Sequence, residues 1–582
     1  SSSCQRGLAT MAFHTTLKVV VVWCSVVSFV VANSGSKTLP CPAFGETVGV
    51  EVLVYGATAG GVIAAVAASR SLAPSFASNS TTFKVILMNS GTHLGGMVSG
   101  GLGYTDGKDS GGIAREFFTA TGGYHFAPST AERVFNQLVT NASVQIVSSC
   151  RIERVVKNGD GRLASITTHT GGTITAIAFI DATYEGDLMA AANVSFTIGR
   201  EAHTTYNESA GGVLVSPPAW GCGCNWEFGM IDGTDGNGNP LPMVQEYANA
   251  SSVGLGDSKV QAYNFRLCMT KNKTNSLQMP VPTTYNASEW ELLRRVFATK
   301  KKSFSIASFF APRLVDATKA DVNNGGGFST DMIGASWTWP TASYVQRKHI
   351  FDVHKNYTQS LYHFLTTAEV VPSSLKNEVL AWGLCADEFV DSGGWPHQLY
   401  VREARRMVGS FVFTQQDRVE NITKSDAIAL GDYNVDAHMA QRVLLANGSV
   451  TNEGCLSGWA SKAGVHLRSF EIPYRVMLPR QEEASNLLVT AALSASHVGF
   501  ASLRLEPQFM NIGQAAGVAA AILVNTTIEI KFDQHDIVYD GTKTGTAPQP
   551  QTDTTTTIPS SSSSTTTTTT TTTARTTTTT TT

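Results

Sequence analysis

The stretch that most limits what this chain can fold into is Val50–Arg70, with the sequence VEVLVYGATAGGVIAAVAASR. Glu51–Tyr55 is a run of β-forming residues and predicts a buried parallel strand. The alanine-rich run from about Gly60 to Arg70 predicts a helix with small side chains that lies close on a sheet. A strand, a glycine turn and a helix in this order are typical of a nucleotide-binding α/β domain.

The turn departs from the dinucleotide-binding fingerprint at one position. Gly56 permits the tight turn, and Gly60 and Gly61 let the helix N-terminus approach a pyrophosphate, whose charge suits the free N–H groups. Thr58 stands where the fingerprint has its second glycine, and its hydroxyl is a candidate donor to phosphate. Taken alone, the turn also fits strand–turn–helix packing without any ligand.

Later segments add further parts of such a domain. The predicted second strand, FKVILMN, ends on Asn89, where an acidic residue normally holds the adenosine ribose; an amide still hydrogen-bonds a hydroxyl, but without charge assistance. The glycine-dense stretch Gly91–Asp106 predicts a loop whose backbone comes close to a flat ligand. Ala176–Ile180 predicts another buried strand, and a helix beginning at Pro507 carries small residues on its packing face.

From Val50 to Val524 the chain resembles the FAD-dependent oxidoreductase family that pairs a Rossmann-type FAD domain with an inserted substrate domain, a family often labelled xanthan-lyase-like. The strings that carry the resemblance are HLGGMVSGGLGYTD, IDATYEGDLMAAANVSFTIGREA, YNFRLCMT, NNGGGFSTDMIGASWTWP, WGLCADEF, GGWPHQLYVREARRMVG and LRLEPQFMNIGQAAGVAAA. The resemblance implies an α/β fold with a Rossmann-type FAD-binding domain, like that of glutathione-reductase-like flavoproteins, and an inserted α+β substrate domain. Members also carry a G-x-T turn, so Thr58 fits the family, whereas Asn89 departs from its usual acid.

The resemblance also implies FAD as the cofactor and indicates which residues hold it. The expected cofactor contacts are Gly56, Thr58, Ala59, Gly60, Gly61, Asn89, His93, Gly95, Gly96, Met97, Asp181, Ala182, Thr183, Gly513, Gln514, Ala515, Ala516 and Gly517. The expected domains are a first part of the FAD-binding domain at 49–199, a substrate or cap domain at 200–480 and a C-terminal part of the FAD-binding domain at 481–535.

The segment SGGWPHQLYVREARRMVG carries the most candidate catalytic groups of the predicted substrate domain. From Gln398 onward it predicts a helix that brings three guanidinium groups within one or two turns, those of Arg402, Arg405 and Arg406. Such groups bind a carboxylate, polarise a substrate oxygen or stabilise a reduced, anionic flavin. The alternative is a salt-bridged structural helix in which Glu403 and nearby acids are the partners.

Histidine and tyrosine residues are the candidate bases. His397 or Tyr400 is expected to remove a hydroxyl proton while hydride leaves the adjacent carbon, and His497 is a further candidate; packing or capping roles are the alternative. His93 is a candidate for a covalent bond to flavin. The motif Cys222-Gly-Cys224 is interpreted as two cysteines paired with distant partners rather than as a redox-active disulfide. We expect no metal site, because no His/Cys cluster has zinc-ligand spacing.

The two ends of the chain predict a secreted glycoprotein. Residues 11–32 have the charge, the apolar run and the small final residue of a signal peptide, with an uncleaved anchor as the alternative. Residues 542–582 form a Ser/Thr-rich tract with almost no apolar residues, so it cannot form a packed core. We expect it to be a disordered, O-glycosylated stalk. Eleven N-x-S/T sequons lie between the ends, at Asn79, Asn141, Asn193, Asn207, Asn249, Asn272, Asn286, Asn356, Asn421, Asn447 and Asn525.

Composition limits the partners. A formal net charge of −3 predicts no binding to nucleic acid, and we expect no stable membrane span after signal cleavage. The expected function is a secreted or cell-surface FAD-dependent oxidoreductase that takes hydride from a small or carbohydrate-like substrate, with oxygen as a candidate acceptor. The alternatives are a polysaccharide-lyase-like enzyme and a non-catalytic extracellular binding protein with a relic nucleotide fold.

Overall fold

The computed structural model describes residues 38–72, 83–107, 111–214, 231–299, 303–420, 422–458, 460, 464 and 467–535. The predicted signal peptide, the Cys222-Gly-Cys224 motif and the Ser/Thr-rich tract lie outside these residues, so their assignments stay predictions. The chain divides into a unit that ends at Ile530 and a second unit from Lys531, of which only residues 531–535 are described.

The largest element of the fold is an eight-stranded, mostly parallel sheet. Its order is β1-β4-β3-β2-β7-β6-β5, with β20 also paired to β7. The strands are β1 (Thr38–Leu39), β2 (Thr47–Tyr55), β3 (Phe83–Met88), β4 (Gln145–Val147), β5 (Ile152–Lys157), β6 (Leu163–Thr168), β7 (Thr173–Asp181) and β20 (Leu487–Val489). Strands β1, β4, β3, β2, β7 and β20 pair in parallel, whereas β5 and β6 form an antiparallel extension of β7. This order confirms the predicted Rossmann-type α/β fold.

Strand β2 is buried on both faces of this sheet, which explains its continuous run of apolar residues. Val52 and Val54 belong to the core on the side of α2 (Ala59–Ser71), while Leu53 and Tyr55 belong to the core on the opposite side. The predicted strand, turn and helix of Val50–Arg70 are therefore confirmed. The predicted strands at 83–88 and 176–180 are confirmed as β3 and β7.

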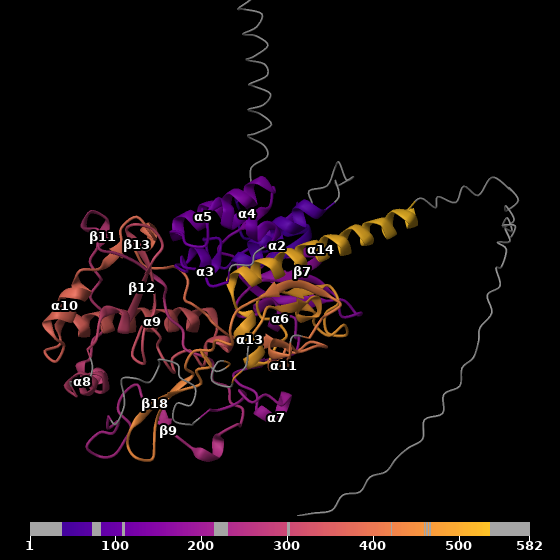
Figure 1. Ribbon diagram of the computed structural model, residues 1–582. Coiled ribbons are helices and arrows are strands. Elements are labelled where there is room, and N and C mark those ends of the chain that lie inside the picture. The colour runs from indigo at the N-terminus through magenta and orange to yellow at the C-terminus, as the bar shows by residue number, and fades with distance from the viewer. Residues whose placement is uncertain are drawn as a thin grey trace, which may run out of the picture. The chain divides into compact units, whose positions relative to one another are not determined.

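A second sheet has five antiparallel strands in the order β11-β14-β10-β13-β12. Its strands are β10 (Leu267–Thr270), β11 (Ser276–Leu277), β12 (Phe310–Leu314), β13 (Lys319–Asn324) and β14 (Gly383–Cys385). Helices α8 (Glu291–Ala298), α9 (Tyr344–Thr367) and α10 (Ser373–Leu380) come from the same part of the chain, and α9 contacts α10 (Figure 1). This antiparallel sheet with separate helices is the α+β insertion that the sequence predicts.

Three small sheets are also present: β8 (Phe196–Ile198) with β15 (Arg405–Met407), β16 (Ala427–Gly431) with β19 (Phe470–Pro473), and β9 (Glu246–Tyr247) with β17 (Gln441–Leu444) and β18 (Val450–Glu453). The remaining α-helices are α3 (Gly96–Ser99), α4 (Gly112–Ala120), α5 (Pro128–Asn141), α6 (Asp187–Ala191), α7 (His203–Tyr206), α11 (Gln415–Val419), α13 (His497–Leu503) and α14 (Glu506–His535). Short 3-10 helices occur at Ala250–Ser252, Lys273–Asn275, Ala287–Trp290, Ile306–Ser308, Trp339–Thr341, Val390–Ser392 and Tyr474–Met477.

The long helix α14 runs beside α2 (Figure 1) and depends on glycine where the two meet. A Cβ atom on Gly513 would lie 2.1 Å from the carbonyl oxygen of Gly60, and one on Gly517 would lie 2.2 Å from that of Ala64. The Glu506–Thr527 part is long and apolar enough to cross a membrane, and half of its most apolar window is buried in the protein. Its close packing on α2 is that of a core helix.

Candidate active site

The turn after β2 is held together by its own side chains. Gly56 has a φ of +103°, and a Cβ there would lie 2.7 Å from the backbone nitrogen of Thr183, so only glycine fits. Thr58 is the N-cap of α2: its hydroxyl accepts the N–H of Gly61 and donates to the carbonyl oxygen of Ala182. The hydroxyl that was a candidate phosphate donor therefore ties the turn to the end of β7.

Asn89, at the end of β3, also bonds within the protein. Its Oδ1 accepts the N–H of Ala57 at 3.3 Å, and its Nδ2 donates to the carbonyl oxygen of His93 at 3.0 Å. The side chain thus joins the β2 turn to the following loop, and an acid could not make the second bond because a carboxylate has no donor.

Asp181 and Thr183 close the end of β7 in a similar way. The Asp181 carboxylate accepts from the N–H and hydroxyl of Thr183 and from the N–H of Met189, and burial raises its pKa to about 6. Its acceptors are therefore used to shape the start of α6.

These strand ends border a cavity of about 510 Å³, which we call the turn cavity. Of the expected cofactor contacts, it is lined by Gly56, Thr58, Asn89, His93, Gly96 and Thr183. Its other wall comes from the start of α9 and from the segment that precedes β15, including Arg347 and His397. The cavity thus lies at the carboxyl ends of the parallel strands, where ligands bind in open α/β sheets.

His93 and His397 form a stacked pair in the wall of the turn cavity, with ring centroids 3.9 Å apart. Both nitrogens of His93 are 3.0 Å from carboxylate oxygens, those of Glu132 and Asp391, and the bond to Glu132 raises the pKa of His93 despite its partial burial. Both nitrogens of His397 are buried without a hydrogen-bond partner among the described residues, and burial lowers its pKa to about 4. His93 is therefore a poor nucleophile for a covalent flavin bond, whereas His397 is a neutral imidazole with free polar atoms.

The predicted helix from Gln398 onward is wrong: this segment is extended and ends in β15. Tyr400 donates its N–H to the carbonyl oxygen of Asn264, and β15 pairs with β8. The residues from Leu399 to Met407 are buried or half-buried. The predicted helix would need a polar face exposed to solvent, and this segment has no such face. Tertiary contacts override the helix-forming composition of this segment.

Because the segment is extended, its three arginines point to different places. Arg402 lines a second cavity described below, Arg405 pairs with Asp187 beside the turn cavity at 2.9 Å, and Arg406 pairs with Glu201 and Glu403. The predicted cluster of three guanidiniums on one helix is therefore not formed. For Arg405 and Arg406, the salt-bridged alternative describes what the structure shows.

The second cavity has a volume of about 280 Å³ and is lined by four arginines, so we call it the arginine cavity. Its arginines are Arg266, Arg313, Arg402 and Arg504, and its wall also contains Tyr400, His438, Asp106 and Asp436. Arg266 is bound to Asp321 through two hydrogen bonds, Arg402 lies 3.0 Å from Asp331, and Arg504 lies 2.9 Å from Asp436. Arg504 also donates to the hydroxyl of Tyr400 at 3.1 Å.

His438 is the histidine of the arginine cavity. Its Nδ1 lies 2.7 Å from Oδ2 of Asp331, and because a carboxylate only accepts, Nδ1 carries the proton and Nε2 keeps its lone pair. Burial and the positive charge of Arg402 lower the pKa of His438, although Asp331 opposes them. His438 is therefore a neutral imidazole that can accept a proton at Nε2.

Glu506, the first residue of α14, forms a buried pair with Tyr184. The Tyr184 hydroxyl donates to Oε1 of Glu506 at 2.6 Å and accepts the N–H of Met97 at 2.9 Å. Oε2 of Glu506 is buried without a partner among the described residues, and burial raises the pKa of this carboxyl to about 8. Glu506 is thus protonated at neutral pH, next to Leu505, which lines the arginine cavity.

His497, the third expected base, lies outside the lining of both cavities. Its Nδ1 is 2.9 Å from Glu403, and this contact together with Arg406 lowers the pKa of Glu403 to about 2 in spite of burial. His497 therefore belongs to a buried ion-pair network.

The expected cofactor contacts at the end of the chain lie away from the turn cavity. Gly513 and Gly517 face α2, Gln514 accepts the N–H of Ile113 at 2.7 Å, Ala515 borders a different hollow and Ala516 is fully buried. Ala59, Gly60, Gly61, Gly95, Met97, Asp181 and Ala182 surround the turn without lining the cavity. A cofactor role for these residues stays a prediction.

Several residues of the arginine cavity were not singled out in the sequence. Arg266 stands in YNFRLCMT, Arg504 stands in LRLEPQF, and Asp106 ends the glycine-dense loop, so the family strings contained them. His438, in DAHMA, lies outside those strings. Its partner Asp331 is more than 100 residues away, and no sequence spacing signals that pairing.

The turn cavity fits the FAD that the resemblance implies. A Cβ on Gly96 would lie 2.5 Å from the Tyr184 hydroxyl, so the loop is shaped by glycine where it borders the cavity. The cavity meets the N-terminal turn region of α2, and His397 supplies two buried polar atoms without a protein partner. A dinucleotide is the ligand class that this combination suits.

Comparison with known proteins identifies the family of this chain. A family model described as FAD dependent oxidoreductase matches residues 51–535. Among solved structures, THI4 of Thermovibrio ammonificans is 15% identical, with a TM-score of 0.21, and the match covers 32% of this chain and 74% of that one. A flavin-containing monooxygenase from Stenotrophomonas maltophilia is 16% identical, with a TM-score of 0.19, over 27% of this chain and 44% of that one. Thioredoxin reductase of T. acidophilum is 20% identical, with a TM-score of 0.16, over 23% and 34%.

The matched part thus spans less than half the length of the monooxygenase and of the reductase. The comparison with curated protein sequences gave no match.

Proposed function

The chain belongs to the FAD-dependent oxidoreductase family, and from this premise we propose that it oxidises a hydroxyl group of a small or carbohydrate-like substrate bound in the arginine cavity. FAD is the cofactor, and when bound it supplies the acceptor for the hydride. The observation that carries the proposal is a polar cavity of about 280 Å³ whose wall holds a neutral histidine, His438, with its Nε2 4.0 Å from Oδ2 of Asp436 and without a hydrogen bond among the described residues.

The residues of the turn cavity would hold the cofactor. The β2 turn and the N-terminus of α2 suit the pyrophosphate, because helix N–H groups and the helix dipole favour negative charge. Asn89 and His397 offer polar atoms along the same cavity. Arg347, although paired with Asp187 at 2.6 Å, adds positive charge to the opposite wall.

His438 is the proposed base. Its Nε2 would take the hydroxyl proton of the substrate, while Asp331 accepts the Nδ1–H and stabilises the imidazolium that forms. A neutral imidazole is required for this step, and the lowered pKa of His438 keeps it neutral at physiological pH. This assigns the role expected of His397, Tyr400 or His497 to a different histidine.

Tyr400, Arg402 and Arg504 would orient the substrate oxygen. Because the Tyr400 hydroxyl already accepts from Arg504, its own proton is free to be donated to the substrate. Arg402 lies 4.6 Å from the centre of the Tyr400 ring, which holds the two side chains in one place. Tyr400 and Arg402 were candidate catalytic residues, whereas Arg504 was not singled out in the sequence; all three line the arginine cavity.

We also propose that the enzyme is secreted and glycosylated. Cys41–Cys150 and Cys268–Cys385 are disulfides, and Cys455 is disulfide-bonded as well, which is typical of an oxidising compartment. Among the sequon asparagines that the structure describes, seven are exposed: Asn141, Asn193, Asn207, Asn249, Asn272, Asn286 and Asn447. Oxygen, which is available outside the cell, is the proposed electron acceptor.

The experiment is to express the chain through a eukaryotic secretory route and to mix the purified enzyme with sugars and polyols under anaerobic conditions. We expect flavin absorption that is released as free FAD on denaturation, bleaching by substrate, and recovery of the absorption with formation of peroxide when air is admitted. A folded protein that neither contains nor takes up FAD, or a flavoprotein that no hydroxyl compound bleaches, would contradict the proposal.

His438→Asn tests the proposed base. Asparagine keeps a donor to Asp331 but has no acceptor at the position of Nε2. We expect the rate of bleaching to fall by about 10²–10⁴-fold, the usual contribution of a general base, with FAD content unchanged. In the wild type the rate should fall as the pH is lowered through the pKa of His438, and the variant should lose this dependence. If the bleaching rate depended on pH in the same way in both proteins, His438 would not be the base.

A further inference from the structure

We propose that the substrate of the arginine cavity is a monosaccharide-sized hydroxy acid, such as an aldonate or a uronate, whose carboxylate binds between Arg402 and Arg266. The inference rests on the proposed function and names its substrate class. It is carried by the hydrogen-bond donors of the cavity that no protein group uses.

Arg402 has one unused donor in a buried position. Its Nη1 donates to the carbonyl oxygen of Ala262 and lies 3.0 Å from Asp331, and its Nη2 donates to Asn264. Its Nε is buried and has no partner among the described residues. A buried N–H of a cation is costly to leave unpaired, so this atom indicates a missing acceptor.

Arg266 offers a second donor in the same cavity wall. Its Nε and Nη2 are bound to the two oxygens of Asp321, while no described residue accepts from its Nη1. Two arginines with unused donors suit a carboxylate, which has two acceptor oxygens and prefers charge-assisted bonds.

The acidic residues near these arginines are largely engaged by the protein. Oδ2 of Asp331 is bound to His438, Oδ1 of Asp331 lies 3.0 Å from Arg402 as an ion pair without a hydrogen bond, and Asp436 accepts from Arg504 at 2.9 Å. Burial, together with the nearby positive charges of Arg504 and Arg266, lowers the pKa of Arg402. An anion between these guanidiniums would relieve their mutual repulsion. Asp106, on the same wall, offers an acceptor for the hydroxyls of the substrate.

Arg313 adds a positive charge on the exposed side of the cavity. It lies over the ring of Tyr104 at 5.4 Å, and no carboxylate of the described residues is within ion-pair distance of it. An unpaired cation at the entrance raises the rate at which anions enter.

The volume limits the size of this anion. About 280 Å³ lies just below the usual range for ligand sites, which is about 300–1,000 Å³. A single sugar acid therefore suits the cavity better than a polysaccharide segment.

The test compares matched substrates on the flavin-loaded enzyme: D-gluconate with D-glucitol, D-glucuronate with D-glucose, and D-galacturonate with D-galactose. We measure anaerobic bleaching rates and, separately, binding by isothermal titration calorimetry. We expect kcat/KM to be about tenfold or more higher for at least one acid than for its neutral partner, because one charged hydrogen bond is worth about 1.5–3 kcal/mol. The KM of the acid should rise with salt more than that of the neutral sugar.

Arginine variants locate the carboxylate. Arg402→Lys should raise the KM or Kd for the acid about 10–100-fold and lower the acid-to-neutral preference. Arg313→Gln, at an exposed site where misfolding is not expected, should lower the association rate of the acid, and Arg313→Lys should restore it. Arg294→Gln, an exposed arginine paired with Glu291 away from the cavity, is the control and should change neither measurement.

The outcomes separate the two proposals. Bleaching by neutral sugars at rates equal to those of the acids would overturn the carboxylate inference while the oxidoreductase proposal stands. Acids that bind with dependence on Arg402 and Arg313 but bleach no flavin would uphold the inference and contradict the proposed reaction. Calorimetry that detects no binding of any of the three acids would overturn the inference.

Discussion

At the residue scale, two departures from the dinucleotide fingerprint have structural reasons. Thr58 replaces a glycine, yet its hydroxyl caps α2 and bonds the end of β7. Asn89 replaces an acid, and its amide bonds both the turn and the next loop. In each case, hydrogen bonds from the side chain hold the turn in shape, although the glycine or the acid of the fingerprint is absent.

Asn89→Asp tests this reading, because it restores the common residue of the fingerprint. The carboxylate would lose the donor to His93 and face its carbonyl oxygen instead. We expect the free energy of unfolding to fall by about 1–3 kcal/mol, the range for leaving a polar group unpaired, and FAD to bind more weakly. Thermal unfolding measures the change in stability, and FAD titration measures the change in affinity. Asn89→Ala is the control, because it lacks the repulsion between a carboxylate and the carbonyl oxygen of His93. An Asp variant that binds FAD more tightly than the wild type would show that the ribose contact dominates.

Glu506 is expected to make stability depend on pH. Its folded pKa of about 8 lies above the value of about 4.3 for a free Glu, so its contribution is fully present below pH 4.3 and is lost as the pH rises toward 8. Glu506→Gln keeps an acceptor for Tyr184 and cannot ionise.

The stability of the Gln variant relative to the wild type should therefore increase between about pH 5 and pH 8, at up to about 1.4 kcal/mol per pH unit. Thermal unfolding of both proteins across this range measures the difference. A difference that stays constant with pH would mean that Glu506 ionises as it does in water.

At the scale of elements, packing decided what local composition did not. The segment 398–407 has residues that form helices well, but its buried position between β8 and Asn264 requires an extended chain. The glycines of helix α14, which the sequence predicts as cofactor contacts, lie at its crossing with α2, and their cofactor role stays a prediction. In both cases the segments packed around the element, and not its own composition, decide its conformation or its packing.

Gly517→Ala measures the crossing of α14 with α2. In an isolated helix this change is stabilising by about 0.8–1.0 kcal/mol, but here the new Cβ would lie 2.2 Å from the carbonyl oxygen of Ala64. We expect a net loss of about 1–3 kcal/mol, the usual cost of overpacking, seen as a lower Tm. Gly159→Ala, where a Cβ meets nothing within 4 Å, is the control. Unchanged stability of the Gly517 variant would mean that the two helices can move apart at no cost.

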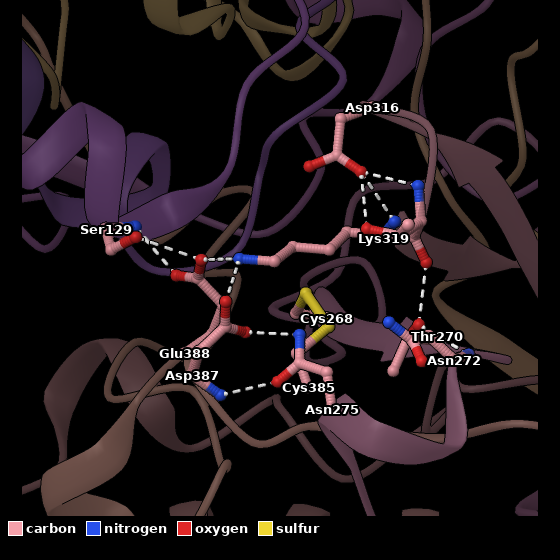
Figure 2. The surroundings of a disulfide bond; sticks show 11 residues. Ser129, Cys268, Thr270, Asn272, Asn275, Asp316, Lys319, Cys385, Asp387 and Glu388 are labelled. Carbon is pink, nitrogen blue, oxygen red and sulfur yellow. Dashed lines mark hydrogen bonds and ion pairs between the residues drawn. A yellow bond between two sulfur atoms is a disulfide. The ribbon is translucent and has the colours of Figure 1, made fainter.

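At the scale of the whole molecule, the insertion is linked to helix α5 next to a disulfide. Figure 2 shows Cys268–Cys385 between β10 and β14, with Lys319 reaching Asp387 and Glu388 beside it. Glu388 also accepts from the N–H and the hydroxyl of Ser129, at the start of α5. These bonds connect the insertion with a helix of the nucleotide-binding part.

Removal of this disulfide should therefore destabilise the molecule without touching either cavity. The bond closes a loop with a sequence separation of 117, for which the chain-entropy model predicts about 4.7 kcal/mol. We expect the Cys268→Ser, Cys385→Ser double variant to unfold at a clearly lower Tm, with bleaching kinetics unchanged in the protein that remains folded. A loss of activity at full stability would instead indicate that the disulfide takes part in the reaction.

The sequence by itself determined the Rossmann-type unit, since strand periodicity, the positive φ at Gly56 and the small residues of α2 are local properties that act over a few residues. It also indicated the family and its cofactor through long matching strings. Only the tertiary structure decided which polar groups share a cavity, because Arg266, Arg402, His438 and Arg504 come from distant segments. It also decided that Arg405 and Arg406 form ion pairs and that His497 hydrogen-bonds Glu403, since the burial of a side chain and the distance to its partner are not encoded in spacing along the chain.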